Sequence, residues 1–175
     1  MASAVTVLSR QRRMKDFFNL EGSKYILIGR TTSWQDDMYP PLPTGNETSV
    51  EELIGCKLVK NQWYCKMLTN PTQAEKEAGI YYKGHYYYVT VDPVLAVENG
   101  CTGVMLFTQL DRDELPLETF RQVGVQVLVQ NNAEVMLPIT FNTLTDKGNL
   151  EIIENRKPQT RADDQEEDLY ICIEF

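Results

Sequence analysis

This sequence has little of what catalytic and metal-binding proteins normally need. It contains one histidine, His85, and its four cysteines stand far apart, at Cys56, Cys65, Cys101 and Cys172. A structural zinc site normally shows closely paired ligands, so this pattern predicts no metal and four reduced thiols. There is no glycine-rich phosphate loop and no nucleophile motif. We therefore expect a protein that is not an enzyme and needs no cofactor.

Positive charge and long apolar runs are also scarce. The chain has 17 lysines and arginines against 25 acidic residues, a net charge of −8. A nucleic-acid surface would need a basic face, and a membrane span would need roughly 18 consecutive apolar residues. We therefore expect neither nucleic acid nor membrane as a partner. A chain of 175 residues suits one domain with its own core, so 1–175 is predicted to be a single domain.

The clearest pattern that is present lies at the end of the chain. Four large apolar residues alternate with more polar ones, at Leu169, Ile171, Ile173 and Phe175. This period of two is typical of a half-buried strand. It follows a charged connector, 163–168, and an earlier apolar run that we expect to close at 154–158. The pattern predicts a late strand that completes the core.

The rest of the chain favours strands over helices. Strands are predicted at 24–29, 62–68, 104–108 and 123–130, and a tyrosine-rich hairpin at 81–88. Helices are predicted at 10–19 with Ser9 as N-cap, after a Ser49-x-x-Glu52 capping box, and from Asn70 to Gly79. Short strands at this spacing predict an all-β fold, a β-sandwich or barrel-like, with an N-terminal helix and long loops. The hairpin tyrosines could serve sheet packing, a protein interface or carbohydrate binding.

Two stretches are candidates for contact with other proteins. The long segment 31–48 has no strand or helix pattern and carries Trp34, Tyr39, Pro40 and Pro41, residue types that suit docking onto a partner. The alternative is that this segment covers the core, with Trp34 as a plug. The basic cluster of the first helix includes Arg12 and Arg13. It is either a solvated face or a contact for an acidic neighbouring subunit.

Four groups of residues, in a fixed order, resemble a known family. Glu154-Asn155-Arg156-x-Pro158, Asp164-Gln165-x-Glu167 and the strand ending in Phe175 resemble the end of the baseplate wedge protein of T-even contractile-tailed bacteriophages, the gene 8 product family. Earlier matches are Phe17-Phe18-Asn19 with Ile26-x-Ile28-Gly29-Arg30 and Trp34, then Tyr88 to Pro93, then Phe120 to Val123. This chain is much shorter than the T-even protein.

The resemblance implies a structural component of a phage tail baseplate. It further implies that the chain binds neighbouring wedge or tail proteins during assembly, forms a homodimer, and reaches the virion after assembly in the host cytoplasm. A second hypothesis rests on the tyrosines, which would suit a fibre-attachment or glycan-binding module of the virion.

Overall fold

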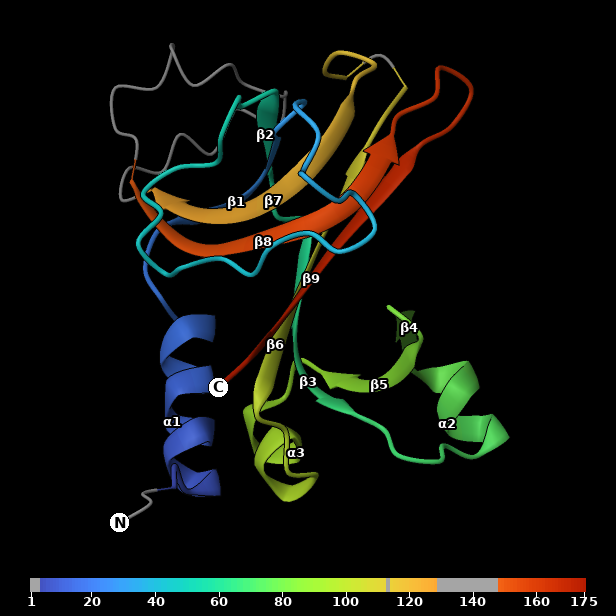
Figure 1. Ribbon diagram of the computed structural model, residues 1–175. Coiled ribbons are helices and arrows are strands. Elements are labelled where there is room, and N and C mark those ends of the chain that lie inside the picture. The colour runs from blue at the N-terminus through green and yellow to red at the C-terminus, as the bar shows by residue number, and fades with distance from the viewer. Residues whose placement is uncertain (1–3, 113, 129–147) are drawn as a thin grey trace. The chain divides into compact units, whose positions relative to one another are not determined.

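The computed structural model describes residues 4–112, 114–128 and 148–175 (Figure 1). The elements are α1 (Val7–Phe18), β1 (Ser23–Gly29), β2 (Gly55–Leu58), β3 (Asn61–Met67), α2 (Gln73–Ala78), β4 (Ile80–Tyr82), β5 (His85–Thr90), α3 (Pro93–Glu98), β6 (Gly103–Leu110), β7 (Thr119–Leu128), β8 (Asn149–Thr160) and β9 (Glu167–Glu174). The expected mainly β class with an N-terminal helix and long loops is confirmed. None of the helices in the described ranges has the length and apolar character needed to span a membrane.

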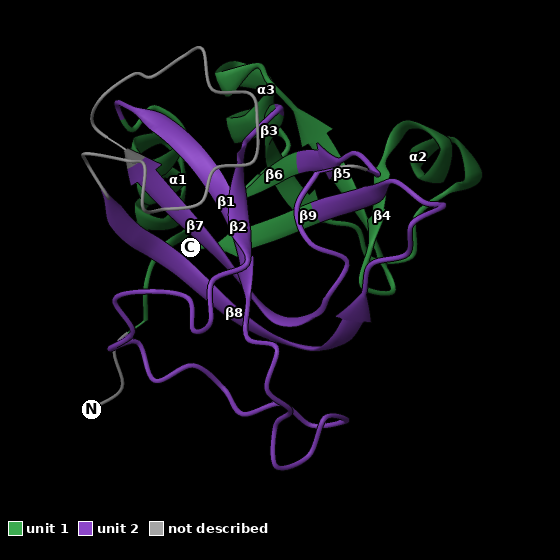
Figure 2. Ribbon diagram, turned by 90° about the horizontal axis from the view of Figure 1, so that it is seen from above, with its two compact units in different colours: residues 1–20, 61–107, 170–175 green, residues 21–60, 108–169 purple. Residues whose placement is uncertain are grey.

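The strands of the described residues form two sheets. One has the order β2-β1-β7-β8, and the other has the order β4-β5-β3-β6-β9. The chain divides into two compact units, shown in different colours in Figure 2. Unit 1 contains Met1–Leu20, Asn61–Phe107 and Tyr170–Phe175, and unit 2 contains Glu21–Lys60 and Thr108–Leu169. That the whole chain folds as one domain stays a prediction.

Unit 2 is built on the four-stranded sheet. β1 is buried from Lys24 to Gly29, and β2 and β7 pair with its two edges. Its core cluster consists of Tyr25, Leu27, Val50 and Cys56. The expected end of β8 at 154–158 is wrong, since the strand continues through Thr160. The register shifts between Phe120 and Gln122, and an edge strand tolerates Pro158 at such an irregularity.

Unit 1 is held by the five-stranded sheet and α1. The helix begins one turn earlier than expected, because Thr6, not Ser9, is the N-cap and accepts from the Ser9 N–H. Met14 and Phe17 are buried, and the Phe18 ring stacks on Tyr64 at a centroid distance of 4.0 Å. A second cluster joins Cys65, Tyr87 and Met105, with Tyr82 and Val89 packed against it.

The closing strand is confirmed. In unit 1 the side chains of Ile171 and Ile173 are buried, while Glu174 is exposed. The backbone N–H of Phe175 donates to the Thr102 carbonyl at 3.1 Å, and its ring lies 5.8 Å from the Phe17 ring. These contacts tie down a terminus that would otherwise fray.

Two helix predictions need correction, and one helix was not predicted. No helix follows Ser49. α2 is capped by Thr72, which forms a reciprocal capping box with Glu75, and not by Asn70. α3 is an addition that the analysis of the sequence did not predict. Its N-cap is Asp92, and Pro at the first helical position suits a helix start.

Candidate protein-interaction surface

The long irregular segment lies in unit 2 and is fastened by side chains. Glu52, with a positive φ of 43°, directs its carboxylate back to the start of the segment. The N–H and hydroxyl of Thr31 donate to it at 2.8 and 2.6 Å, and those of Thr32 at 2.8 and 2.6 Å. These hydrogen bonds, first that from the Thr31 hydroxyl, lower the pKa of Glu52 to about 2. The glutamate of the expected capping box therefore closes a loop instead of starting a helix.

Close approach of the backbone supports the same closure. The N–H of Arg30 donates to the Glu51 carbonyl at 2.6 Å. A Cβ on Gly29 would stand 2.5 Å from that carbonyl oxygen and 2.6 Å from a Val50 methyl. Glycine at the end of β1 thus allows residues 50–52 to lie against the strand.

A buried arginine on β7 holds the first part of the segment. Arg121, 8% exposed, binds both carboxylate oxygens of Asp37 at 3.0 Å. It also donates to the Thr31 carbonyl at 2.5 Å and to the Ser33 hydroxyl at 3.1 Å. The guanidinium hydrogen bond, joined by the N–H of Trp34, lowers the pKa of Asp37. Such a two-pronged ion pair fixes geometry as well as charge.

Trp34 is held by its own chain. Its indole N–H donates to the Arg156 carbonyl at 3.0 Å, and the Arg30 guanidinium carbon lies 3.8 Å from the ring centroid. Arg30 also forms an ion pair with Glu51. The side chain is half-buried. These contacts agree with a covering role for Trp34, and its docking role stays a prediction.

Residues 38–42, which we name the apical turn, lie beyond these anchors and expose apolar side chains. Met38 is 60% exposed, Tyr39 81% and Leu42 90%. Pro40 is half-buried and Pro41 is exposed. The turn itself is ordered, because Asp36 accepts from the N–H of Met38 at 2.8 Å and from that of Tyr39 at 3.2 Å.

A chain of amides holds the far side of the apical turn. The Asn155 amide donates to the Pro41 carbonyl at 2.8 Å and accepts from Gln122 at 2.9 Å. Gln122 in turn accepts from the Glu51 N–H at 2.9 Å. The apical turn is therefore held before its start by Arg121 of β7, through Asp37, and near its end by Asn155 of β8.

The other predicted interface residues lie in a different unit. Arg12 and Arg13 are both exposed on α1 in unit 1. The structure thus brings Trp34, Tyr39, Pro40 and Pro41 together in one anchored segment, and it places the two arginines on a separate element.

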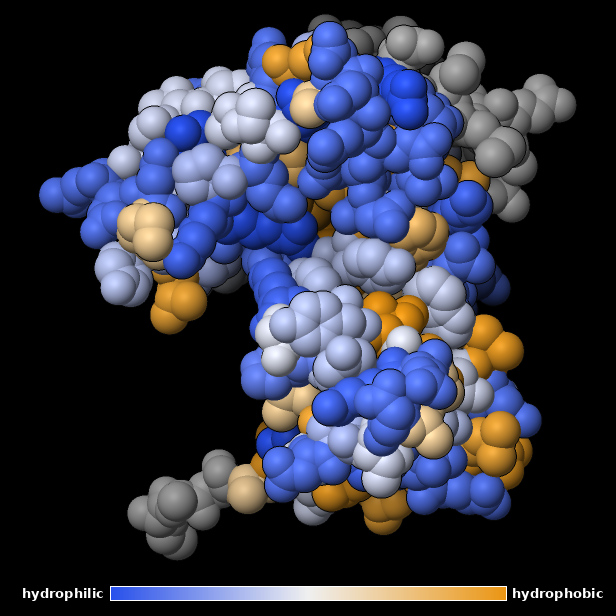
Figure 3. Space-filling model, turned by 90° about the vertical axis from the view of Figure 1, so that its right-hand side faces the viewer, coloured by the Kyte–Doolittle hydropathy of each residue, from blue (hydrophilic) through white to orange (hydrophobic). Residues whose placement is uncertain are grey.

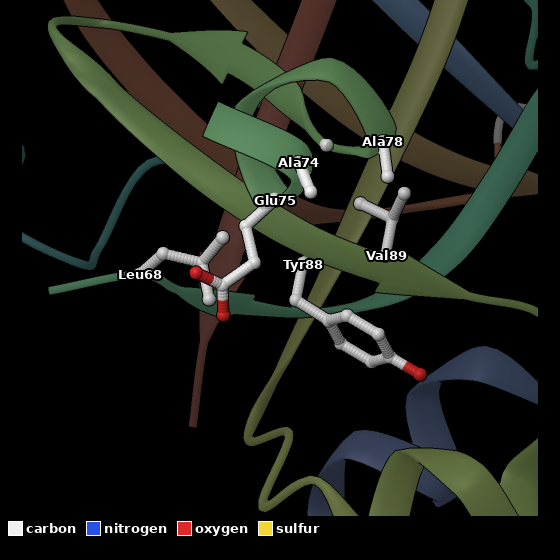
Figure 4. A pocket seen from close by; sticks show the side chains of 7 residues that line it. Leu68, Ala74, Glu75, Ala78, Tyr88 and Val89 are labelled. Atoms are coloured by element: carbon white, nitrogen blue, oxygen red, sulfur yellow. The ribbon is translucent and has the colours of Figure 1, made fainter. Parts of the chain in front are cut away.

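The tyrosine hairpin is divided between core and surface. Tyr82 and Tyr87 belong to the core cluster of unit 1, whereas Tyr81 is 60% exposed and packs on Tyr86 at 4.9 Å. A groove of about 320 Å³ lies between α2 and β5. Figure 4 shows Ala74 and Ala78 of α2 beside Tyr88 and Val89 of β5. The hairpin tyrosines therefore contribute to sheet packing, and Tyr81 remains exposed beside the half-buried Tyr86.

The cysteine thiols show no metal-ligand arrangement. In the described residues, no three His, Cys, Asp or Glu side chains gather as metal ligands would. The Cys65 and Cys172 sulfurs lie 3.6 Å apart, and a Cβ on Gly103 would stand 2.9 Å from the Cys65 sulfur. The hydrogen bond between the thiols lowers the pKa of Cys172 and raises that of Cys65.

The anchoring residues are the ones that the sequence analysis missed. Arg121 and Asp37 are separated by 84 positions, and Glu52 by 21 from Thr31. The one available signal was a charged residue inside an apolar strand, Arg121 directly after Phe120. Buried charges need partners, but the identity of the partner depends on the fold.

The chain thus combines a mainly β fold with an anchored, solvent-exposed apical turn. Comparison with known proteins gives the family. The chain matches, over residues 1–175, the family described as "Baseplate wedge 3 tail fiber network component". It is 31% identical over 147 residues to "Virion protein 3" of Enterococcus phage phiEF24C, covering 83% of this chain and 80% of that protein.

This chain belongs to that baseplate wedge family. The resemblance to baseplate wedge proteins seen in the sequence is thereby confirmed, and the chain is a structural component of the phage baseplate.

Proposed function

We propose that this chain has a purely structural role in the baseplate, and that it binds a neighbouring wedge or tail subunit through the apical turn during tail assembly. The observation that carries the proposal is the exposure of Tyr39 and Leu42 on a segment that Arg121 and Asn155 already fix. Family membership supports the structural role.

The energetics favour such a surface. Ordering a loop costs roughly 1–2 kcal/mol per residue in backbone entropy. In the free chain this entropy cost is already offset by the hydrogen bonds of Glu52, Arg121 and Asn155, which hold the segment. A partner then gains the burial of Tyr39 and Leu42 without ordering the loop. Tyrosine is also among the residue types that most often dominate binding energy in interfaces.

The test replaces Tyr39 and Leu42 together with alanine. Both side chains are exposed, so the melting temperature of the free protein should stay within about 2 °C of the wild type. Incorporation into tails, measured by mass spectrometry of purified particles, should fall sharply. Leu117→Ala is the matched control, because Leu117 is 49% exposed in the same unit but lies outside the segment. Normal incorporation of the double variant would overturn the proposal.

Trp34→Ala separates docking from covering. If Trp34 is a plug, its loss removes the contacts with Arg156 and Arg30, and the melting temperature falls by several degrees. If Trp34 is a docking residue, the melting curve is unchanged and incorporation falls. The two readouts distinguish the roles directly.

We also propose a homodimer, as the resemblance implies, and assembly in the host cytoplasm. The net charge of −8 opposes association of free subunits, so dimerisation should weaken at low ionic strength. Sedimentation velocity at two salt concentrations tests this. A monomer at all concentrations would contradict the dimer.

The alternative of a glycan-binding module rests on one observation, the exposed Tyr81 ring, which packs on the half-buried Tyr86. A soluble-glycan array discriminates the two functions. The alternative predicts a hit that Tyr81→Ala abolishes, and the structural role predicts none.

A further inference from the structure

A second apolar surface lies in unit 1 on two helices. Seven of the fourteen exposed large hydrophobic residues among those described are concentrated on or beside α1 and α3: Val5, Val7, Leu8, Val91, Val94, Leu95 and Val97. Figure 3 shows another side of the molecule, the right-hand side of the view in Figure 1, on which hydrophobic residues (orange) also stand exposed between hydrophilic ones. Concentrated exposed apolar residues mark interaction sites more often than scattered ones.

The two helices are neighbours. The Gln11 amide of α1 donates to the Val97 carbonyl of α3 at 3.3 Å. α3 is also tied to the sheet at its end, because the Lys66 ammonium donates to the Asn99 carbonyl at 3.1 Å and the Asn99 amide to the Tyr88 hydroxyl at 3.2 Å. Ala96 is the buried residue of α3, while Val94 and Leu95 are exposed. α3 is therefore fixed in place with its larger apolar side chains outside.

The apolar residues of α1 continue its buried stripe beyond the core. Val7 lies seven residues before Met14, two helical turns along the same face. Met14 is fully buried, but Val7 is 59% exposed and Leu8 74%. Arg12 follows Leu8 by four positions, and positions four apart in a helix lie on the same side. The α1 side of the apolar surface thus has a basic rim, while α3 contributes the exposed acids Asp92 and Glu98.

We propose that this α1–α3 face binds an acidic amphipathic helix of another baseplate protein. An amphipathic helix suits it because exposed apolar residues at helical spacing are what such a helix buries. The acidic character follows from the rim: the twelve residues of α1 carry Arg10, Arg12, Arg13 and Lys15 against one acid, Asp16. The inference rests on the proposed role within the baseplate and adds a second contact with a partner of stated charge.

A second copy of this chain fits the face less well. A twofold contact brings the same patch of both copies together. Where the two basic α1 helices lie at the twofold axis they meet each other, and like charges across an interface oppose binding. The face is therefore assigned to a different chain.

The test places a photo-crosslinking amino acid, p-benzoylphenylalanine, at Val94 and separately at Leu8, both exposed. Glu77 on α2, also exposed, is the control position. Tails assembled in infected cells are irradiated, and the crosslinked peptides are identified by mass spectrometry. We expect Val94 and Leu8 to link to the same acidic helical segment of another tail protein, and Glu77 not to do so.

Charge reversal sharpens the result. Arg12→Glu should reduce crosslinking at Val94 by about fivefold, the equivalent of one rim ion pair. Arg112→Glu, an exposed change in unit 2, should leave it unchanged. Links to a second copy, links to a basic segment, or no link at Val94 and Leu8 in tails that contain the chain would each overturn the inference. Absence of the chain from tails would instead contradict the proposed function.

Discussion

Irregular segments are usually expected to be poorly anchored and regular helices to be well packed. The segment that joins β1 to β2 and the helix α3 show the reverse. The segment has no regular structure over residues 30–54, yet Glu52, Arg121 and Asn155 hold it through charged and amide hydrogen bonds. α3 is a regular helix with its own N-cap, yet most of its large apolar side chains are exposed.

The difference shows that regular secondary structure and complete packing of apolar side chains are separate properties. An irregular backbone is rigid when side chains satisfy its polar groups, and it can then present a few apolar residues in a fixed position. A regular helix remains incomplete when its apolar face has nothing to pack against. Each region therefore offers a surface to a partner, one by anchored exposure and the other by unfinished packing.

The largest expected effect comes from removing residues 169–175. The side chains of Leu169, Ile171 and Ile173 are buried, and burial of three such residues contributes roughly 5–9 kcal/mol. That approaches the whole stability of a typical domain. The truncated chain should be insoluble or molten, as measured by solubility and near-UV circular dichroism. Glu174→Ala, at an exposed site on the same strand, should behave like the wild type.

A shorter truncation, which removes only residues 170–175 of unit 1, tests whether 1–175 is a single domain. Leu169 belongs to unit 2 and the later residues to unit 1. Hydrogen exchange should show protection lost in both β1 and β5 if the chain folds cooperatively. Retained protection in β1 would contradict the single domain and would show that the two units fold independently.

Loss of the buried guanidinium should have the next largest effect. Arg121→Ala leaves Asp37 without its partner, but Asp37 keeps partial solvent access, its side chain being 31% exposed. We therefore expect a loss of about 2–4 kcal/mol, less than for a fully buried pair. The melting temperature should fall by roughly 4–16 °C. Arg121→Lys keeps the charge without the two-pronged geometry, so its melting temperature should lie between those of the wild type and Arg121→Ala. An unchanged melting curve for Arg121→Ala would show that the segment is not anchored there.

A smaller effect depends on pH. Hydrogen bonds lower the pKa of Glu52 to about 2 in the folded chain, against an ordinary value of 4.5. A depressed folded-state pKa contributes stability that is fully present above the unfolded value and is lost as the pH falls. Stability should therefore decline between about pH 4.5 and pH 2, and Glu52→Gln should flatten that decline. Urea titrations at a series of pH values measure this decline. Identical pH dependence for the two proteins would contradict the role of the Glu52 carboxylate in holding Thr31 and Thr32.

The smallest expected effect is that of oxidation. Cys65 and Cys172 lie on β3 and β9, with β6 between them. Strands two apart are separated by about 9.6 Å, whereas a disulfide needs Cα atoms within about 7 Å. Mild oxidants should therefore leave the pair unlinked, and Cys172, with its lowered pKa, should be alkylated before Cys65. A disulfide-linked peptide in mass spectra of the folded protein would contradict this geometry.

Local patterns carried much of the fold. The alternation of Leu169, Ile171 and Ile173 identified the closing strand, because burial on one face repeats every second residue. The hairpin around Lys83 and Gly84 was visible from turn chemistry, and both residues have positive φ. The helix at Pro93 was missed although Asp92 carried a recognisable cap signal.

Contacts between distant residues were not predictable in the same way. Glu52 suited a capping box at Ser49, but its carboxylate instead accepts hydrogen bonds from two threonines that precede it by about twenty positions. The docking candidates Trp34 and Tyr39 looked alike in the sequence. They differ in the structure because only Trp34 reaches the Arg156 carbonyl, a partner that the topology brings to it.

Amide hydrogen exchange of the free protein tests the central claim most directly, namely that the irregular segment is anchored before any partner arrives. The N–H groups of Thr31 and Thr32 donate to Glu52, and that of Trp34 to Asp37. These three amides should exchange far more slowly than unstructured peptide at pH 7, and Glu52→Gln should accelerate the first two and spare the third. Exchange of all three at the rate of an unstructured chain would contradict the account.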